Sequence, residues 1–526
     1  MSNNPTTLPS WKKLLSLAET IQGKRTLSFF ETEKDRTSNM SVHNDTLLYD
    51  YSKQRVTAEI TENLFSLLNE SGFEEKKKSL FSGEKINITE NASVLHTALR
   101  NPKKEKIIVD GENILPHIHD ALQRMETLSK KIHAGELKGA TGEAINTIVS
   151  IGIGGSDLGP RMVFQALNQK YKSPITTHFV SNIDGEDIQS TLKQCDPQKT
   201  LFVIISKSFK TQETLTNAQT ARDWIINSLP ENADIAPHFV TASGNREAAM
   251  QFGLSEDNIY PMWEWVTGRF SLWSAAGLSL SLHFGYEVFH VLLDGAYNAD
   301  QHFLNEPNEK NIPVIMALLG IWNRNFLQYP HTALLPYREK LKYMPSYIQQ
   351  LEMESNGKNI DKDGNHITNY DTAPITFGEI GTNGQHSFYQ LLHQGTIKVP
   401  CDFIGVIKDD SGLQNHHNLL LSNMLAQGQA MLQGRLNPQE PHLYFDGNAP
   451  SSTFLFTKMD AHDLGYLIAL FEHKTFVQGA IWNINSFDQY GVELGKELAH
   501  KLESNDLSDA DPSTKALISH IHKAEK

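Results

Sequence analysis

Four side chains combine the residue types that proton transfer needs with positions where a ligand could reach them. Glu354 ends the helical pattern YIQQLEMESNGK, so its carboxylate should lie at the tip of an element, where it could act as a base. Arg269 lies in the aromatic window WEWVTGRFSLWSAAGLSL, and a buried guanidinium must meet an anion. His386 closes the loop GEIGTNGQH, and Lys496 lies in SFDQYGVELGKEL. Ordinary structural or solvated roles remain open for all four.

A carboxylate and a cation are the minimum set for moving a carbonyl group between neighbouring carbons. The base takes the proton beside the carbonyl and returns it one carbon over, while the cation stabilises the charge that develops on the enediol oxygen. Opening a sugar ring beforehand needs further proton donors and acceptors, for which histidine and lysine are suited. The four side chains therefore provide one candidate for each role.

Two strand-to-helix junctions are candidates for binding a phosphate group. The run GIGGS at 152–156 follows an expected strand at 145–151 and precedes an expected helix near Pro160. Its glycines would let backbone amides approach an anion at a helix N-terminus, although a tight turn would use the same residues. Asp157 occupies the place of the third glycine of a dinucleotide fingerprint, which disfavours a nicotinamide dehydrogenase.

The second junction, SKSFKTQET at 206–214, gathers hydroxyl groups and amides where a helix should begin. A helix cap needs one hydroxyl group, and this segment offers several. The sequence therefore favours a monophosphate site here over an ordinary capped helix.

The histidine pairs His117/His119 and His416/His417 invite a metal interpretation. No cysteine cluster, His-Glu-x-x-His motif or Asp-rich loop supplies further ligands at a known spacing. We therefore expect a catalyst without metal or other cofactor, whose activity survives EDTA.

Composition narrows the compartment and the partners. Cys195 and Cys401 are too few for a disulfide framework, so we expect free thiols and a reducing, cytoplasmic location. The formal net charge of -14 argues against nucleic acid as a partner, because binding a phosphate backbone needs clustered basic residues. The first residues lack the apolar stretch of a signal peptide, and no window reaches the length of a membrane span, so we expect no membrane partner.

The elements that must position these side chains follow an alternating pattern. The chain of 526 residues is too long for one ordinary core, so we expect more than one domain. Residues 1 to about 120 look helical. From about 144, β-rich runs at 145–151, 175–181, 201–206 and 238–242 alternate with helical patterns.

A second region of the same kind begins near residue 313. It includes the runs TALLPY at 332–337 and CDFIGVI at 401–407 and long helices around 415–432 and 463–474, whereas 355–385 reads as a long loop or short hairpins. We therefore predict an α/β fold with two doubly wound parallel sheets, helices on both faces and ligands at the carboxyl ends of the strands.

Long segments of the chain resemble the glucose-6-phosphate isomerase family. WEWVTGRFSLWSAAGLSL at 263–280 and FDQYGVELGKELA at 487–499 are similar to its two signature segments. The resemblance also includes LLYDYSKQR at 47–55, FSGEKINITENASVLHTALR at 81–100, IGIGGSDLGP at 151–160, MESNGK at 353–358 and GTNGQHSFYQLLHQGT at 381–396. It therefore extends over nearly the whole chain.

The resemblance implies interconversion of glucose 6-phosphate and fructose 6-phosphate, a step of glycolysis and gluconeogenesis. It implies that Glu354 moves the proton between C2 and C1, that Arg269 stabilises the enediolate, and that His386 and Lys496 serve ring opening. It also implies that His386 enters the site from the neighbouring subunit, so that the protein is a homodimer with shared active sites. The positions that match sugar-phosphate-binding or pocket-lining residues of the family are Gly155, Ser156, Ser206, Lys207, Ser208, Thr211, Gln350 and Gln489.

The family fold consists of two sugar-isomerase-type α/β domains and a C-terminal arm. Carried over, it implies a helical N-terminal segment at 1–120, α/β domains at 121–285 and 286–505, and a C-terminal tail at 506–526. Three positions depart from the family pattern: Ser208 and Lys210 each replace a threonine, and Ile380 replaces a proline. A non-catalytic sugar-phosphate sensor is the alternative function, since fold alone does not fix activity.

Overall fold

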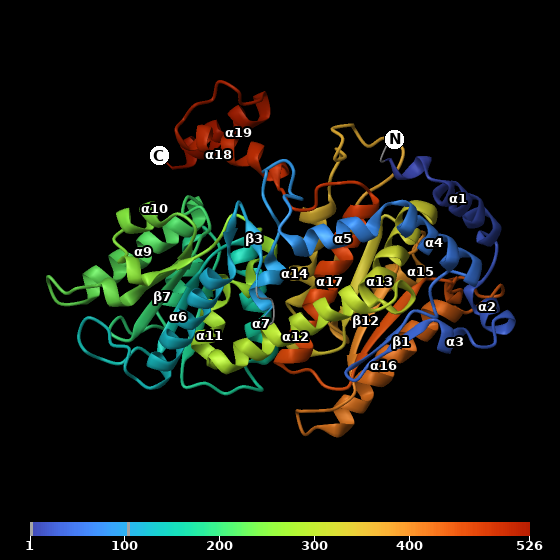
Figure 1. Cartoon of the computed structure of the whole chain (residues 1–526), viewed down its shortest axis with the longest axis horizontal. Coiled ribbons are helices and arrows are strands. Elements are labelled where there is room, and N and C mark those ends of the chain that lie inside the picture. The colour runs from blue at the N-terminus through green and yellow to red at the C-terminus, as the bar shows by residue number, and fades with distance from the viewer. Residues whose placement is uncertain (1–3, 102–105, 526) are drawn as a thin grey trace. The chain divides into compact units, whose positions relative to one another are not determined.

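The computed structural model describes residues 4–101 and 106–525 of the chain. These residues form two compact units, Met1–Ser486 and Phe487–Lys526. Unit 1 contains two parallel-stranded sheets with helices against them, which confirms the predicted α/β class (Figure 1). Among the described helices, none combines the length and the apolar character that crossing a bilayer requires.

The first sheet has five parallel strands in the order β6-β5-β7-β8-β9. Their bounds are β5 Thr147–Ile151, β6 Thr176–Val180, β7 Thr200–Ile205, β8 Phe239–Ser243 and β9 Ile259–Pro261. The first four coincide with the predicted runs, because strands buried on both faces read as continuous apolar segments. The short β9 carries no such signal and was not predicted.

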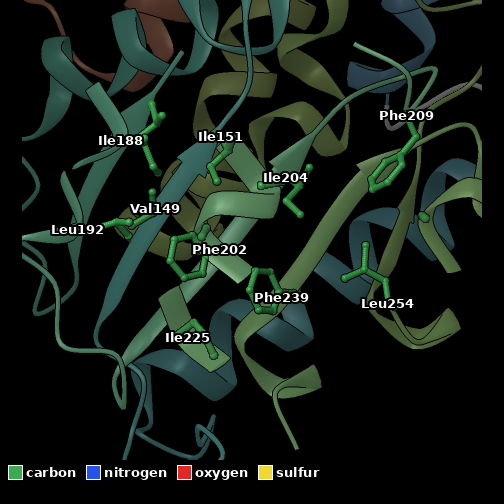
Figure 2. Packing of buried hydrophobic residues seen from close by; sticks show 14 of the residues in the cluster. Val149, Ile151, Ile188, Leu192, Phe202, Ile204, Phe209, Ile225, Phe239 and Leu254 are labelled. Atoms are coloured by element: carbon green, nitrogen blue, oxygen red, sulfur yellow. The ribbon is translucent and has the colours of Figure 1, made fainter. Parts of the chain in front are cut away.

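The connecting helices of this sheet are α7 Leu158–Leu167, α8 Gly185–Leu192, α9 Gln212–Ser228 and α10 Arg246–Gln251. Figure 2 shows how the strands and helices share one apolar core, with Phe202 and Ile204 of β7 beside Phe239 of β8 and Ile225 of α9. The strand order reverses between β5 and β7, since the chain passes from β5 to β6 on one side and returns to β7 on the other. A ligand crevice is expected at that reversal, outside the carboxyl ends of the strands.

The second sheet has six strands in the order β1-β2-β13-β12-β10-β11. Their bounds are β1 Ser41–His43, β2 Leu47–Asp50, β10 His331–Pro336, β11 Ile375–Gly378, β12 Cys401–Val406 and β13 Ser451–Phe456. The last four strands are parallel, whereas β2 runs antiparallel to β13 and β1 antiparallel to β2.

Three features of the second sheet differ from the sequence analysis. The region read as helical contributes β1 and β2, and the segment read as a loop contributes β11. β13 was also missed. Each of β1, β2 and β11 has only three or four residues, too few for a clear period of two, so neighbouring strands rather than local pattern fix them.

Long helices pack between the two sheets, with α12, α14 and α17 at the centre of unit 1 (Figure 1). α17 spans Ala461–Ile481 and is buried along nearly its whole length, including Glu472 and Lys474, which pair with charged residues of neighbouring elements. Its neighbours are α12 Tyr286–Asn305, α13 Ile312–Ile321 and α14 Met344–Asn356. The other helices of unit 1 are α1 Pro9–Ile21, α2 Thr26–Thr32, α3 Arg36–Asn39, α4 Ala58–Glu70, α5 Phe73–Ser82, α6 Leu115–His133, α11 Leu278–Phe284, α15 Tyr389–Gln394 and α16 Gln414–Gln433.

Unit 2 is helical and contains the 3-10 turn η13 (Tyr490–Val492), α18 (Glu493–Glu503) and α19 (Pro512–Ala524). Asp511 caps α19, because its carboxylate accepts hydrogen bonds from the backbone N–H groups of Ser513 and Thr514. Both helices have an apolar stripe and a charged face, and neither buries a residue.

Candidate active site

The two loops predicted to bind phosphate follow β5 and β7, the strands between which the sheet order reverses. The first contains the 3-10 helix η3 (Gly154–Ser156), and the second runs from Ser206 to Thr211, the N-cap residue of α9. Because β5 and β7 are parallel neighbours, both loops leave the same edge of the sheet. This edge is where a doubly wound sheet binds its ligand.

The second loop contains a buried hydroxyl group that makes no hydrogen bond to the described residues. The hydroxyl oxygen of Ser206 is buried and has no hydrogen-bond partner among the described residues. Thr211 has extended backbone angles and makes no side-chain cap, so the first N–H groups of α9 are not satisfied by its hydroxyl. Ser208 is exposed and accepts a hydrogen bond at its carbonyl from Asn245. A buried hydroxyl group without a described partner, beside a helix N-terminus, suits an anionic ligand.

The first loop packs directly on the segment that carries the candidate arginine. A Cβ atom on Gly155 would lie 2.2 Å from the carbonyl oxygen of Gly268 and 2.7 Å from the backbone nitrogen of Arg269. Only glycine therefore fits at residue 155. A Cβ atom on Gly154 would lie 3.1 Å from Nε2 of Gln350, which places that predicted pocket residue beside the same loop. Ser156 follows at the end of η3.

Lys207 connects the second loop to the same arginine segment. Its Nζ donates hydrogen bonds to the carbonyl oxygens of Glu264 and Val266, at 3.0 and 3.1 Å. The carboxylate of Glu264 lies 3.6 Å from that ammonium group. Lys207 thus ties the second loop to the chain shortly before Arg269.

Arg269 and Glu354 lie within one site, as the pairing of base and cation requires. Arg269 lies on the 3-10 helix η6 (Gly268–Trp273), and Nη1 is 3.9 Å from Oε2 of Glu354 on the last turn of α14. The arginine side chain is 1% exposed, whereas the glutamate side chain is 24% exposed. Oε2 of Glu354 accepts no hydrogen bond within residues 4–101 and 106–525. A carboxylate oxygen in that state can accept a proton from a ligand.

Buried ion pairs connect the helices that pack next to Arg269 and Glu354. Lys474 of α17 donates to Oε1 of Glu352 at 2.5 Å, and Thr376 donates to the other oxygen of that carboxylate at 2.9 Å. On the far side of η6, Arg100 binds both oxygens of Asp300 and one oxygen of Glu472. Such pairs fix the relative positions of α12, α14, α17 and η6.

Three further predicted residues are on other elements of the described chain. His386 ends the 3-10 helix η11 (Asn383–His386) and is exposed, and no hydrogen bond among the described residues joins its ring to Glu354. Gln489 and Lys496 belong to unit 2, where Nζ of Lys496 lies 2.8 Å from Oε1 of Glu493. The roles of these three residues stay predictions.

The structure also reveals polar residues that the sequence analysis did not assign. Ser355 and Ser486 accept hydrogen bonds from Arg269, and the hydroxyl of Thr214 is buried without a partner among the residues described. Ser355 stands inside MESNGK, beside the predicted base, but serine there reads as a helix terminator. Only the fold brings Ser486 to the arginine, so no local pattern could have identified it.

The arrangement can hold a phosphate group at the ends of β5 and β7 while a carboxylate and a guanidinium act on another part of the same ligand. The carboxylate oxygen can accept a proton, and the adjacent cation can stabilise an oxygen that gains negative charge. Arg269 follows the last strand of the first sheet, and Glu354 lies on α14 between two strands of the second, so segments associated with both sheets contribute to one site.

Comparison with known proteins shows similarity over almost the full length. Residues 50–518 match the family model described as phosphoglucose isomerase. The chain is 46% identical to a glucose-6-phosphate isomerase of Methylococcus capsulatus (strain Bath), with 98% of each chain covered. It is 45% identical to a glucose-6-phosphate isomerase of Deinococcus radiodurans, again with 98% of each covered. The crystal structure of a glucose-6-phosphate isomerase from Chlamydia trachomatis superposes with a TM-score of 0.89 at 33% identity, covering 99% of this chain and 100% of that one.

Proposed function

The chain belongs to the phosphoglucose isomerase family, and from this premise we propose that it interconverts glucose 6-phosphate and fructose 6-phosphate reversibly. The observation that carries the proposal is the proximity of Glu354 to Arg269 beside two loops suited to phosphate. Such a step belongs to glycolysis and gluconeogenesis. The two free cysteines, Cys195 and Cys401, support a cytoplasmic location.

In the proposed reaction, Glu354 removes the proton from C2 of the open-chain aldose and returns it to C1. The cis-enediolate formed in between carries charge on oxygen, and the guanidinium of Arg269 stabilises that charge. His386 and Lys496 open and close the sugar ring by proton transfer at the ring oxygen and the anomeric hydroxyl. The groups proposed to hold the sugar phosphate are Gly155, Ser156, Ser206, Lys207, Ser208, Thr211, Gln350 and Gln489.

A coupled assay of fructose 6-phosphate conversion, with EDTA present, tests this assignment. Glu354→Gln should lower kcat by about 10²–10⁴ with a modest change in substrate affinity, because it removes the base and leaves the phosphate loops intact. Glu339→Gln, an exposed glutamate at the start of η10 (Glu339–Leu341), is the matched control and should turn over like the wild type. Near-wild-type turnover by Glu354→Gln would refute the assignment.

The same preparation separates an isomerase from a sugar-phosphate sensor. Exchange of the substrate C2 hydrogen with deuterated water requires proton abstraction, which a pure binding protein cannot perform. We expect exchange with the wild type and much slower exchange with Glu354→Gln. Tight binding without exchange by the wild type would favour the sensor.

We further propose that the protein acts as a homodimer with shared sites. Two features support this: His386 is exposed on η11, and large apolar side chains are exposed nearby on α15 and α16, among them Leu391, Leu419 and Leu425. Burial of these exposed apolar side chains against a second subunit would be favourable.

Subunit mixing tests the shared site. Glu354→Gln and His386→Ala should each be nearly inactive as pure proteins. If each site takes its base and its histidine from different subunits, every mixed dimer carries one intact site. Random mixing makes about half of the dimers mixed, so about a quarter of all sites, and about a quarter of the wild-type activity, should be restored. Absence of recovery in demonstrated hybrids would place both residues of a site in one subunit.

A further inference from the structure

Arg269 donates hydrogen bonds to Ser355 and Ser486, which have no assigned role. Its Nε donates to the hydroxyl oxygen of Ser355 at 2.6 Å, and its Nη2 donates to the carbonyl oxygen of Ser486 at 2.5 Å. Both acceptors are buried, and the side chain of Ser355 has no exposed surface. A guanidinium is planar and rigid, so hydrogen bonds from two of its nitrogens to fixed acceptors determine its orientation.

Ser355 follows Glu354 directly on the last turn of α14. The peptide that carries the base thus also carries an acceptor for the cation, and any shift of this turn moves both. Another nitrogen of the guanidinium, Nη1, lies 3.9 Å from Oε2 of the Glu354 carboxylate. Ser355 therefore links the positions of the two reacting groups.

The second anchor is fixed by Asn356, the last residue of α14. Its Nδ2 donates to the carbonyl oxygen of Thr475 on α17 at 2.9 Å, and its Oδ1 accepts from the hydroxyl of Ser486 at 2.6 Å. α17 can approach this closely because residue 479 is glycine: a Cβ atom there would lie 1.9 Å from the hydroxyl oxygen of Ser486.

We infer that Ser355 is a positioning residue for the isomerisation, which acts by orienting the guanidinium of Arg269 toward the enediolate formed beside Glu354. The inference rests on the proposed function and deepens it. Asn356 supports the same orientation indirectly by holding the Ser486 carbonyl. Neither side chain needs to touch the substrate.

The direct test is Ser355→Ala, which removes the acceptor and little volume. The kcat for fructose 6-phosphate should fall about ten- to a hundredfold, as expected when a buried hydrogen bond to a charged group is lost, whereas KM should change by less than about threefold. Ser271→Ala is the matched control. Ser271 lies on η6 two residues after Arg269, is fully buried, and its hydroxyl has no partner in the described part of the chain.

Binding of inhibitors separates orientation of the cation from a general structural defect. A hydroxamate analogue of the enediolate carries negative charge where the reaction develops it, whereas a sugar alcohol 6-phosphate does not. Ser355→Ala should weaken the hydroxamate about as much as it lowers kcat and leave the sugar alcohol phosphate nearly unchanged. Equal weakening of both would indicate a distorted pocket and overturn the inference.

A double-mutant cycle with Arg269→Lys tests whether Ser355 acts through the arginine. Lysine has no Nε–H group in a fixed fork, so Ser355→Ala should change the kcat of Arg269→Lys by less than about twofold. A full additive loss, or wild-type kcat in a correctly folded Ser355→Ala, would refute the positioning role. An inactive wild type would instead refute the proposed function, so the two failures are distinguishable.

Discussion

Arg100 offers the strongest test of how buried charge holds the site in place. Its side chain lies in the 3-10 helix η2 (His96–Arg100) and is fully buried against α12, α17 and η6. Nε and Nη2 donate to the two oxygens of Asp300 at 2.9 and 2.7 Å, and Nη1 donates to Glu472 at 2.5 Å. Arg100→Met keeps the length and apolar volume of the side chain and leaves both carboxylates without their cation.

The expected loss follows from these contacts. Hydrogen bonds to charged groups contribute about 1.5–3 kcal/mol each, so three of them amount to roughly 4.5–9 kcal/mol. Breaking a buried ion pair by removing one partner costs about 3–5 kcal/mol in measured cases, because the remaining group relaxes or changes protonation. We therefore expect Arg100→Met to lower the free energy of unfolding of the chain by about 5 kcal/mol near neutral pH.

The loss should depend on pH in a direction that the pKa shifts determine. Burial alone would raise the pKa of Asp300, but Arg100 and the hydrogen bond from His473 outweigh it and leave that pKa below its usual value. The pKa of Glu472 is raised, chiefly by burial. Without the arginine, burial should raise both pKa values, so the folded variant takes up protons as the pH falls. The difference in the free energy of unfolding between the wild type and Arg100→Met should therefore become smaller as the pH falls from 8 to 5.

Thermal and urea unfolding followed by tryptophan fluorescence provide the assay. The guanidinium lies 4.7 Å from the ring centroid of Trp273, whose indole donates to Glu472 at 2.8 Å, so one of the seven tryptophans of the chain lies in the network. Arg246→Met is the control, since its ion pair with Glu256 is exposed and should contribute less than about 1 kcal/mol. A loss below about 1 kcal/mol for Arg100→Met, or a deficit that widens toward low pH, would refute this reasoning.

Three further substitutions test two residues of the site and one buried carboxyl group of the second sheet. Gly155→Ala should reduce kcat/KM by on the order of a hundredfold, because its Cβ would meet the carbonyl oxygen of Gly268 at 2.2 Å, whereas Gly268→Ala meets nothing within 4 Å and should be mild in the same assay. Ser206→Ala should raise KM about tenfold with little change in kcat if its hydroxyl binds the phosphate, and an unchanged KM would exclude that contact. Burial, with help from Glu352, raises the pKa of Asp402 to about 6, so the stability that its neutral form contributes is lost as the pH rises through 6. Asp402→Asn should flatten the decline of Tm between about pH 4 and pH 6, the range between the pKa of this carboxyl group in the unfolded chain and in the folded chain, and an unaltered decline would contradict this reasoning.

Most of the first sheet could be predicted from the sequence because four of its strands are continuous apolar runs that can be recognised locally. LFVIIS at 201–206 is a continuous apolar run that ends in polar residues, and β7 occupies Thr200–Ile205. β11 could not be predicted in this way. Its residues lie in a polar, glycine-rich segment, and Ile375–Gly378 becomes a strand only because β10 offers it a parallel edge.

In the site, too, some residues could be assigned from the sequence and others only from the folded structure. The resemblance assigned Glu354 and Arg269, and the structure brings them within 3.9 Å of each other although they are far apart in the chain. Nothing in the local pattern pointed to Ser355 or Ser486 as partners of the arginine, because a serine has no distinctive spacing. Such supporting contacts depend on the packing of α14 against α17, which only the folded chain defines.

The contacts around Arg269 also connect substrate binding to catalysis. On one side, the two loops proposed to bind phosphate contact its segment: Gly155 packs on the peptide that precedes Arg269, and Lys207 donates to the carbonyl oxygens of Glu264 and Val266. On the other side, Ser355 ties its guanidinium to the turn that carries the base. A phosphate bound between the loops would therefore restrain the cation as well as the sugar, so that binding energy from the non-reacting end of the substrate acts at the reacting carbons. For this reason a change that displaces a loop, such as Gly155→Ala, should lower kcat, whereas loss of a single hydroxyl such as that of Ser206 should affect mainly KM.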